Sequence, residues 1–225
     1  MGKQKPDRIR TCFFAGLVFA ISFIILDFVT FSGVIVSSDI SVFKFINNGD
    51  HTTQLDSAMI LLSDYGREVV WSLVVIGLIV FGGKKERKTA ITLILLVVIL
   101  APLGAVVKAA EPRGRPYAVL PGTRLLVSPE NDSSFPSGHT LIVAGGAVVA
   151  LVCLRKAFSI PLTIEAALVS YSRIYVGVHY PTDVIAGALL GTSVAFLLLS
   201  QSSRLGWIYE RLPIRGESKD KISVN

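Results

Sequence analysis

The chain has 225 residues, of which 52% are hydrophobic and only 17% are charged, and its mean hydropathy is +0.62. Soluble domains carry about 25% charged residues, so this composition excludes an ordinary soluble domain. The net charge of +6 would suit nucleic acid, but the lysines and arginines cluster at the ends of apolar runs, as membrane topology requires. We therefore predict an integral membrane protein with no nucleic-acid partner.

Six apolar segments are candidates for crossing the membrane, a distance that takes about 20 residues of helix. In chain order they cover residues 11–36, 68–83, 89–107, 139–154, 158–175 and 182–199, and residues 55–63 are expected to extend the short second segment. The first segment follows a basic N-terminus without an obvious cleavage site, so it is interpreted as an uncleaved span. After it, Ile40, Phe43 and Ile46 recur every three residues, which indicates a short interfacial helix within residues 39–48.

The predicted fold class is therefore all-α: a polytopic membrane helical bundle with six transmembrane helices and a short interfacial helix. Residues 1–203 are expected to form a single membrane domain, and residues 204–225 a cytoplasmic tail that is partly disordered. Six spans place both termini on one side, where most of the 22 basic residues also fall, so the positive-inside rule makes that side cytoplasmic. The polar segments at 108–138 and 172–183 then share the extracytoplasmic face of the cell membrane.

The joint between the last two spans has the features of a phosphate site. Pro181 suits the first turn of a helix, which places His179 just ahead of a helix N-terminus, where free amides favour an anion. Asp183, four residues on, is positioned to accept a proton from one imidazole nitrogen and leave the other free as base or nucleophile. Arg173 adds a forked, permanently charged donor. Taken alone, the segment has an alternative interpretation as a polar juxtamembrane loop.

Two earlier segments add groups of the same kind at the same face. Lys108 ends the third span and Arg115 follows seven residues later, so the pair either clamps one phosphate or anchors the helix at the headgroups. Ser137 is a natural N-cap for the fourth span, and Gly138 lets the backbone approach a ligand closely. His139 is placed to give or take a proton. The alternative for this second segment is simply a good helix start.

Together the segments read Lys108-x6-Arg115-Pro116, Pro136-Ser137-Gly138-His139 and Ser172-Arg173-x5-His179-x3-Asp183. This pattern resembles the type 2 phosphatidic acid phosphatase superfamily, the membrane lipid phosphatases related to vanadium haloperoxidases, with all three motifs complete and in order. The resemblance implies that His179 attacks phosphorus, oriented by Asp183, and forms a phosphohistidine. It implies that His139 protonates the leaving oxygen and later activates water. The phosphate oxygens would be held by Lys108, Arg115, Arg173, Ser137 and the Gly138 amide.

The function expected is an integral membrane lipid phosphatase acting on a phosphate monoester or diphosphate of a lipid. Polyprenyl diphosphate, phosphatidic acid and phosphatidylglycerol phosphate are the candidate substrates, and membrane lipids are the other expected partners. No Asp/Glu/His cluster with metal-ligand spacing accompanies the motifs, so turnover is predicted to need no metal or other cofactor, and vanadate is expected to inhibit. The alternatives are a lipid or small-solute transporter, a non-catalytic lipid-phosphate-binding protein and, against the hydropathy, a haloperoxidase.

Several polar and small residues lie outside the motifs. The glycines at 145–146 and at 187 and 191 are predicted to allow close helix packing. A structural role is favoured for the intramembrane carboxylates Asp27 and Glu165, since neither matches a motif. Arg113, just before Arg115, is expected either to tune the first motif or to form a surface ion pair with Glu111.

Overall fold

In residues 6–49 and 51–201, the part of the chain that a computed structural model describes, all regular structure is helical, which confirms the predicted all-α class. The elements are α1 (Pro6–Phe31), α2 (Val36–Asn47), α3 (Thr53–Tyr65), the π-helical turn η1 (Gly66–Val70), α4 (Trp71–Val80), α5 (Lys84–Ala110), α6 (Pro116–Val119), α7 (Gly138–Cys153), α8 (Lys156–Tyr175) and α9 (Pro181–Ser200). Helices α1, α5 and α9 are each long and apolar enough to cross a membrane, and α7 is a shorter apolar helix.

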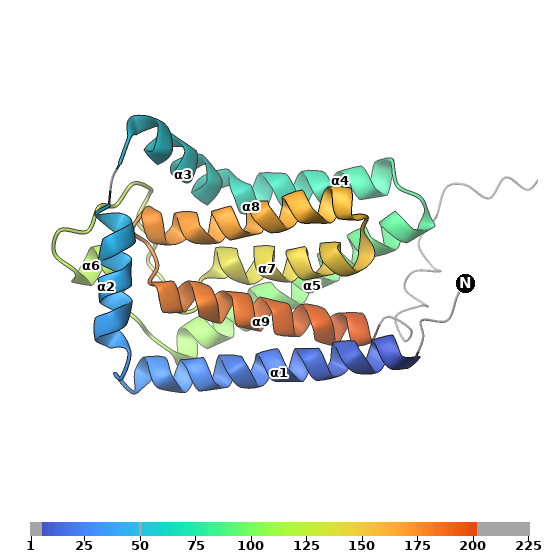
Figure 1. Cartoon of the computed structure of the whole chain (residues 1–225), viewed down its shortest axis with the longest axis horizontal. Helices are drawn as coiled ribbons and strands as arrows, with labels where there is room; N and C mark the ends of the chain where they lie inside the picture. The colour runs from blue at the N-terminus through green and yellow to red at the C-terminus, as the bar shows by residue number, and fades with distance from the viewer. Residues whose placement is uncertain (1–5, 50, 202–225) are drawn as a thin grey trace, which may run out of the picture.

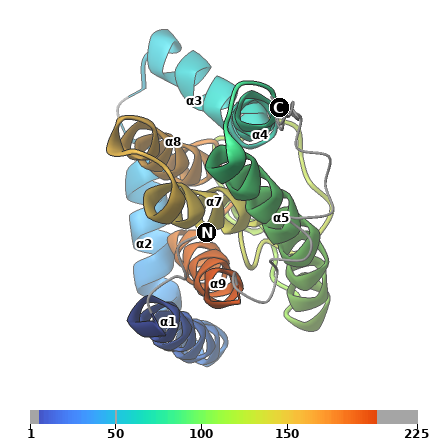
Figure 2. The same ribbon diagram turned by 90° about the vertical axis from the view of Figure 1, so that its right-hand side faces the viewer.

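The long helices run alongside one another, and α2 lies across one end of the bundle (Figure 1). Helix α7 is central: it packs against α5, α8 and α9, and α9 packs in turn against α1 (Figure 2). On the other flank, α3, η1 and α4 follow one another without a break, and this rod contacts α8 and α5. That six helices cross the membrane stays a prediction.

The central contact between α7 and α9 depends on glycine, as the sequence predicted. A Cβ atom on Gly191 would lie 2.1 Å from the Leu141 carbonyl oxygen, and one on Gly187 would lie 2.6 Å from the Ser137 carbonyl oxygen. Only residues without a side chain let the two backbones approach this closely. The contact reaches the first turns of both helices, where the Ser137 amide donates to the Asp183 carbonyl at 2.9 Å. It therefore brings together the second and third motifs.

Several predicted boundaries differ from the structure for local reasons. The first span, expected to run to residue 36, ends at Phe31, because Gly33 adopts a φ of +83° and turns the chain into α2. The expected interfacial helix is α2, and residues 55–63 do extend the second apolar segment, through α3. The basic residues at 84–88 form the first turn of α5, since the Glu86 carboxylate accepts the Gly83 amide at 3.1 Å and caps it.

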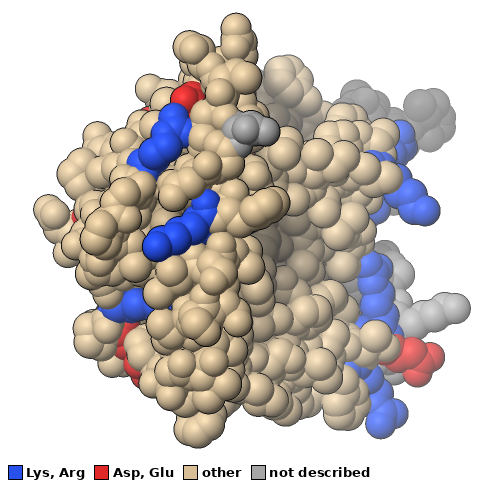
Figure 3. Space-filling view, turned by 60° about the vertical axis from the view of Figure 1, so that its left-hand side comes forward, with Lys and Arg blue, Asp and Glu red and all other residues tan. Residues whose placement is uncertain are grey.

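On the face drawn in Figure 3, charged side chains gather at the two ends of the bundle, with a wide band of uncharged surface between them. One end holds α2, α6 and the α8–α9 connection, and the other holds the start of α1 and the α4–α5 and α7–α8 connections (Figure 1). Between the two ends, inside the bundle, Trp71 Nε1 donates to Glu165 Oε2 at 3.1 Å, which ties α4 to α8 and agrees with a structural role for this carboxylate. The predicted tail at 204–225 lies outside the described residues.

Candidate active site

The three predicted motifs meet at the end of the bundle where α7 and α9 begin (Figure 1). Their basic and imidazole side chains turn inward: Arg115, Arg173 and His179 are 3%, 2% and 1% exposed. His139 and His179 both lie within electrostatic reach of Arg115 and Arg173. The segments that were expected to share one face of the membrane bundle therefore share one site.

His179 lies in the short connection between α8 and α9, with a guanidinium on one side of its ring and a carboxylate on the other. Arg115 Nη1 lies 3.3 Å from its Nε2, and Asp183 Oδ2 lies 3.5 Å from its Nδ1. Because a guanidinium can only donate, Nε2 is the acceptor, and the proton of the neutral ring belongs on Nδ1, facing the carboxylate. Burial, together with Arg173 and Arg115, keeps the pKa of His179 well below its ordinary value. The ring is thus neutral at pH 7, with a lone pair on Nε2.

Three cations form a cradle next to this histidine, defined here as Lys108, Arg115 and Arg173. Arg115 Nη2 lies 2.5 Å from Asp132 Oδ1 and 2.6 Å from Glu130 Oε2. Arg173 pairs with the other Glu130 oxygen, and Lys108 Nζ lies 3.1 Å from Asp132 Oδ2. Two carboxylates thus occupy the space between the three cations.

The cradle keeps both carboxylates ionised. Burial alone would raise the pKa of Glu130, but Arg173 and Arg115 outweigh it and lower that pKa. Burial also opposes ionisation of Asp132, and hydrogen bonds from Arg115 and Lys108 lower its pKa in the same way. Carboxylate and phosphate oxygens present similar acceptors to a guanidinium fork. A phosphate that enters the cradle must therefore displace Glu130 and Asp132.

The start of α7 supplies the second motif. Ser137 occupies the N-cap position as predicted, but its hydroxyl accepts from the Thr140 hydroxyl at 3.2 Å rather than from a backbone amide. The amides of the first helical turn lack intrahelical acceptors, so those at Gly138 and His139 are free to meet an anion. His139 Nδ1 lies 3.5 Å from Arg67 Nη1, and its Nε2 lies 4.0 Å from Glu68 Oε1.

Arg113 supports the site from the opposite side of Asp183. Its Nη1 lies 2.5 Å from Asp183 Oδ1, and its Nη2 lies 2.6 Å from Asp39 Oδ2 on α2. Nη1 also donates to the Thr182 hydroxyl at 2.8 Å, and the guanidinium covers the Tyr180 ring at 4.1 Å. Of the two roles left open by the sequence, the surface ion pair with Glu111 is therefore wrong. The partners of Arg113 are two buried carboxylates.

The family follows from comparison with known proteins. The family model described as the PAP2 superfamily matches residues 89–207, which is more than half of the chain and includes all three motifs. The chain belongs to the PAP2 superfamily. This confirms the resemblance that the motifs predicted.

Relatives and solved structures agree with the assignment to the PAP2 superfamily. An undecaprenyl-diphosphatase of Sulfolobus acidocaldarius is 46% identical over 162 residues, covering 72% of this chain and 77% of the relative. The crystal structure of Aquifex aeolicus LpxE matches with a TM-score of 0.59 and 31% identity, covering 71% of this chain and 93% of that chain. A transmembrane PAP2-type phosphatidylglycerolphosphate phosphatase from Bacillus subtilis matches the fold with a TM-score of 0.68 at 24% identity, covering 90% of this chain and all of the other. The protein is thus a multi-pass membrane phosphatase of the PAP2 superfamily.

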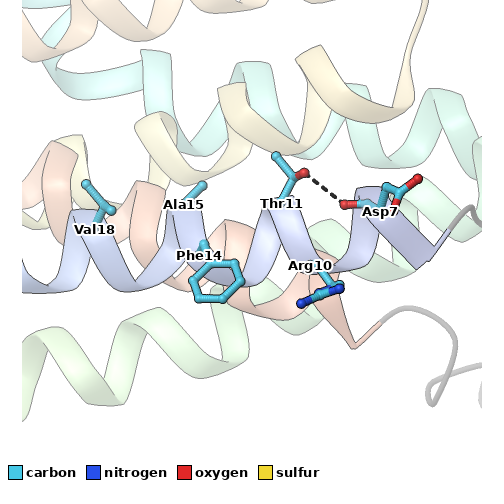
Figure 4. Close-up of a pocket in the computed structure, with 6 residues that line it drawn as sticks. All are labelled: Asp7, Arg10, Thr11, Phe14, Ala15 and Val18. Carbon is cyan, nitrogen blue, oxygen red and sulfur yellow. Dashed lines mark hydrogen bonds between the residues drawn. The ribbon is translucent and has the colours of Figure 1, made fainter.

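A hollow on α1 lies away from the PAP2 motifs. It is lined by one turn of polar residues and one of apolar residues: Asp7, Arg10, Thr11, Phe14, Ala15 and Val18 (Figure 4). Thr11 Oγ1 donates to the Asp7 carbonyl at 2.8 Å within the helix. This part of α1 is at the end of the bundle opposite α2 and α6 (Figure 1), so the hollow takes no part in the site.

Several residues at the site were missed in the sequence. Arg67, Glu68, Glu130 and Asp132 contact motif residues through charged groups. Ser63 accepts from Arg173 Nη1, and Asp39 pairs with Arg113. None lies at a fixed spacing from a motif, and Glu130 and Asp132 belong to a long proline-rich connection without a periodic pattern. The only available signal was their placement on the same predicted face of the membrane as the motifs.

We expect Glu130→Gln to strengthen inhibition by vanadate about tenfold, because the substitution removes a charged competitor for Arg115 and Arg173. Tenfold corresponds to about 1.4 kcal/mol, at the lower end of what one charge-assisted hydrogen bond contributes. The measurement is the vanadate concentration that halves phosphate release. Glu111→Gln is the control, since the Glu111 backbone carbonyl, rather than its carboxylate, accepts from Ser133 beside the cradle. Weaker inhibition of the Glu130 variant would mean that Glu130 supports the arginines instead of competing with phosphate.

Proposed function

We propose that the protein hydrolyses a phosphate monoester or diphosphate of a lipid through a phosphohistidine intermediate, at the extracytoplasmic face of the cell membrane. One observation carries the proposal: a buried, neutral histidine has its free Nε2 beside three cations assembled from two of the motifs. Phosphoryl transfer requires neutralisation of charge and in-line positioning above all else. A neutral nucleophile in a cation cradle meets both requirements.

In the proposed mechanism, the phosphoryl group of the substrate takes the place of Glu130 and Asp132 in the cradle. The Nε2 lone pair of His179 attacks phosphorus, and the bond from phosphorus to the leaving oxygen breaks. His139 gives its proton to that oxygen. It then takes a proton from water, whose oxygen attacks the phosphohistidine and releases inorganic phosphate. Asp183 stabilises the Nδ1 proton of His179 throughout, as expected for a carboxylate that orients an imidazole.

Two features support a lipid as the substrate and the extracytoplasmic side as the location. Helix α2 lies across the end of the bundle that holds the site, and it exposes apolar side chains there, with Phe45 81% and Val42 47% exposed. An amphipathic helix at this position would keep the tail of an amphiphile in lipid while its phosphate enters the cradle. The basic α4–α5 connection is at the opposite end, and the positive-inside rule would make that end cytoplasmic.

The proposal is tested by phosphate release from purified protein given polyprenyl diphosphate, phosphatidic acid or phosphatidylglycerol phosphate. We expect release from at least one lipid, at the same rate in excess EDTA, and inhibition by vanadate. The Sulfolobus acidocaldarius relative is named an undecaprenyl-diphosphatase, which favours polyprenyl diphosphate among the three candidates. A complete loss of activity in EDTA that Mg²⁺ restores would refute metal-independent turnover. Movement of lipid across the membrane without phosphate release would favour the transporter alternative.

A further inference from the structure

We propose that Arg67 binds the lipid-linked phosphate of a diphosphate substrate, so that the protein prefers lipid diphosphates to lipid monophosphates. This inference rests on the proposed function and deepens it, by adding a subsite for the leaving group. The three cradle cations and the motif amides account for one phosphoryl group. Arg67 comes from none of the motifs and lies in η1, on a different rod of the bundle.

The π-helical turn places Arg67 next to the site. Such turns insert one extra residue into a helix and often occur at functional sites. Here the turn begins at Gly66, where a Cβ atom would lie 2.3 Å from Val169 Cγ2, so the rod meets α8 closely at this point. The following residue, Arg67, then reaches the start of α7, and its Nη1 lies 3.5 Å from His139 Nδ1.

Two neighbours define what Arg67 can bind. Glu68 accepts from Arg67 Nε at 2.7 Å and also from Nη2, which leaves Nη1 directed at His139. A Cβ atom on Gly138 would lie 4.0 Å from both Arg67 Nη1 and Lys108 Cε. The open space above the Gly138 backbone is therefore bordered by two cations, one from the cradle and one from outside it. A second anionic group next to the cradle would find its donors there.

The position of Arg67 relative to the two histidines identifies that anionic group. In the proposed reaction, His179 attacks from one side of phosphorus and His139 protonates the group that leaves on the other. Arg67 contacts His139, so it lies on the leaving-group side. If the leaving group were a lipid alcohol, a cation here would only oppose a protonated His139, since like charges repel. If the leaving group is a lipid phosphate, the same cation neutralises the charge that accumulates on it.

The exposure of the arginine side chains also indicates which phosphate of the substrate each arginine would bind. Arg115 and Arg173 have side chains that are 2% exposed, whereas that of Arg67 is 28% exposed. In a lipid diphosphate the terminal phosphate is farthest from the tail, so it would enter the deep cradle, and the lipid-linked phosphate would stay nearer the mouth. The partly exposed Arg67 is at the depth expected for this second phosphate.

The experiment compares a polyprenyl diphosphate with the polyprenyl monophosphate of the same chain, in detergent micelles, for the wild type, Arg67→Gln and Arg67→Lys. We expect Arg67→Gln to lower the ratio of the two kcat/KM values, diphosphate over monophosphate, by about 30-fold or more, as for loss of one transition-state donor. Arg67→Lys, which keeps the charge but not the fork, should give an intermediate ratio. The control is Lys44→Gln, which removes an exposed cation from α2 at the same end of the bundle and should leave the ratio unchanged.

A second measurement does not depend on turnover of the monophosphate. The inhibition constant of inorganic pyrophosphate should rise in Arg67→Gln by a factor similar to the fall in the ratio, and that of orthovanadate should rise much less. Equal losses for both lipids and both inhibitors would overturn the inference and make Arg67 a general support of His139. An unchanged ratio would overturn it as well, as would a wild-type protein that hydrolyses only monophosphates. If the wild type hydrolyses neither polyprenyl lipid but releases phosphate from phosphatidic acid or phosphatidylglycerol phosphate, this inference fails and the proposed function stands. If it releases phosphate from none of these lipids, the proposed function itself fails.

Discussion

His179→Ala is expected to lower phosphate release by about 10⁴-fold or more, the scale on which loss of a nucleophile acts in other covalent mechanisms. The residue is fully enclosed between Arg115 and Asp183, and no other imidazole of the described residues contacts the Arg115 guanidinium. Water that enters the space left by the ring would be a weaker nucleophile than the imidazole Nε2 and would form no phosphohistidine. The remaining activity would come only from the cradle and the motif amides.

Trapping of the phosphorylated enzyme tests whether His179 is the nucleophile or has only a structural role. With a substrate labelled in its terminal phosphate, rapid denaturation should trap an acid-labile phosphoprotein in the wild type and none in His179→Ala. His139→Asn should form the intermediate more slowly, since it lacks the acid for the leaving oxygen, but should retain the label after the substrate is removed, since it also lacks the base that activates water. His51→Gln is the matched control: His51 hydrogen-bonds Tyr175 and Asp56 at the same end of the bundle but outside the site. A labelled His179→Ala protein would show that another residue is the nucleophile.

The convergence of the motifs could be predicted because it depends on topology alone. Hydropathy indicates where apolar helices begin and end. The order of these helices along the chain then determines which polar segments lie on the same face of the membrane. This reasoning placed Lys108, Arg115, His139, Arg173 and His179 together, as they are in the structure. It also identified the glycines of α7 and α9, because small residues at helical spacing indicate close packing of helices in membranes.

The other residues that contact the motif residues and Arg113 could not be predicted, because these contacts depend on how irregular segments fold. Glu130 and Asp132 reach the cradle from a connection of 27 residues between α5 and α7 that has only the one-turn helix α6. The pairing of Arg113 with Asp39 joins residues 74 positions apart, and it requires α2 to lie across the bundle. Arg67 reaches His139 from a π-helical turn. Neither the spacing nor the periodicity of residues in the sequence indicates such contacts.

Arg113→Met is expected to destabilise the protein by about 3–5 kcal/mol, the cost of breaking a buried ion pair by removing one partner. The guanidinium bridges Asp39 and Asp183, which are 4% and 0% exposed, so its loss leaves two carboxylates buried together. Burial opposes the charge on Arg113, but Asp183 and Asp39 outweigh it and raise the pKa of Arg113, so the guanidinium stays charged. Thermal unfolding in detergent measures the change.

The control for the loss of stability in Arg113→Met is Arg124→Met. Arg124 also pairs with an aspartate, 3.0 Å from Asp56 Oδ2, but its side chain is 36% exposed. Exposed pairs contribute about 0–1 kcal/mol, so the control variant should unfold close to the wild-type temperature. Equal destabilisation of the two arginine variants would mean that burial of Asp39 and Asp183 does not set the cost.

In the proposed mechanism Arg113 also positions the Asp183 carboxylate, so its removal should affect the rate separately from stability. Asp183 would keep the hydrogen bond from the Tyr180 amide at 2.8 Å but lose its cationic partner, and its second oxygen would be free to turn from its present direction. At a temperature where the variant stays folded, we expect kcat to fall about 10- to 100-fold, as for other groups that orient a reacting residue through a partner, with little change in KM. Adding Asp39→Asn should recover stability, since one orphaned charge is removed, but not kcat, since Asp183 is still unsupported. Recovery of both together would show that Arg113 acts on the fold alone, and not through Asp183 on His179.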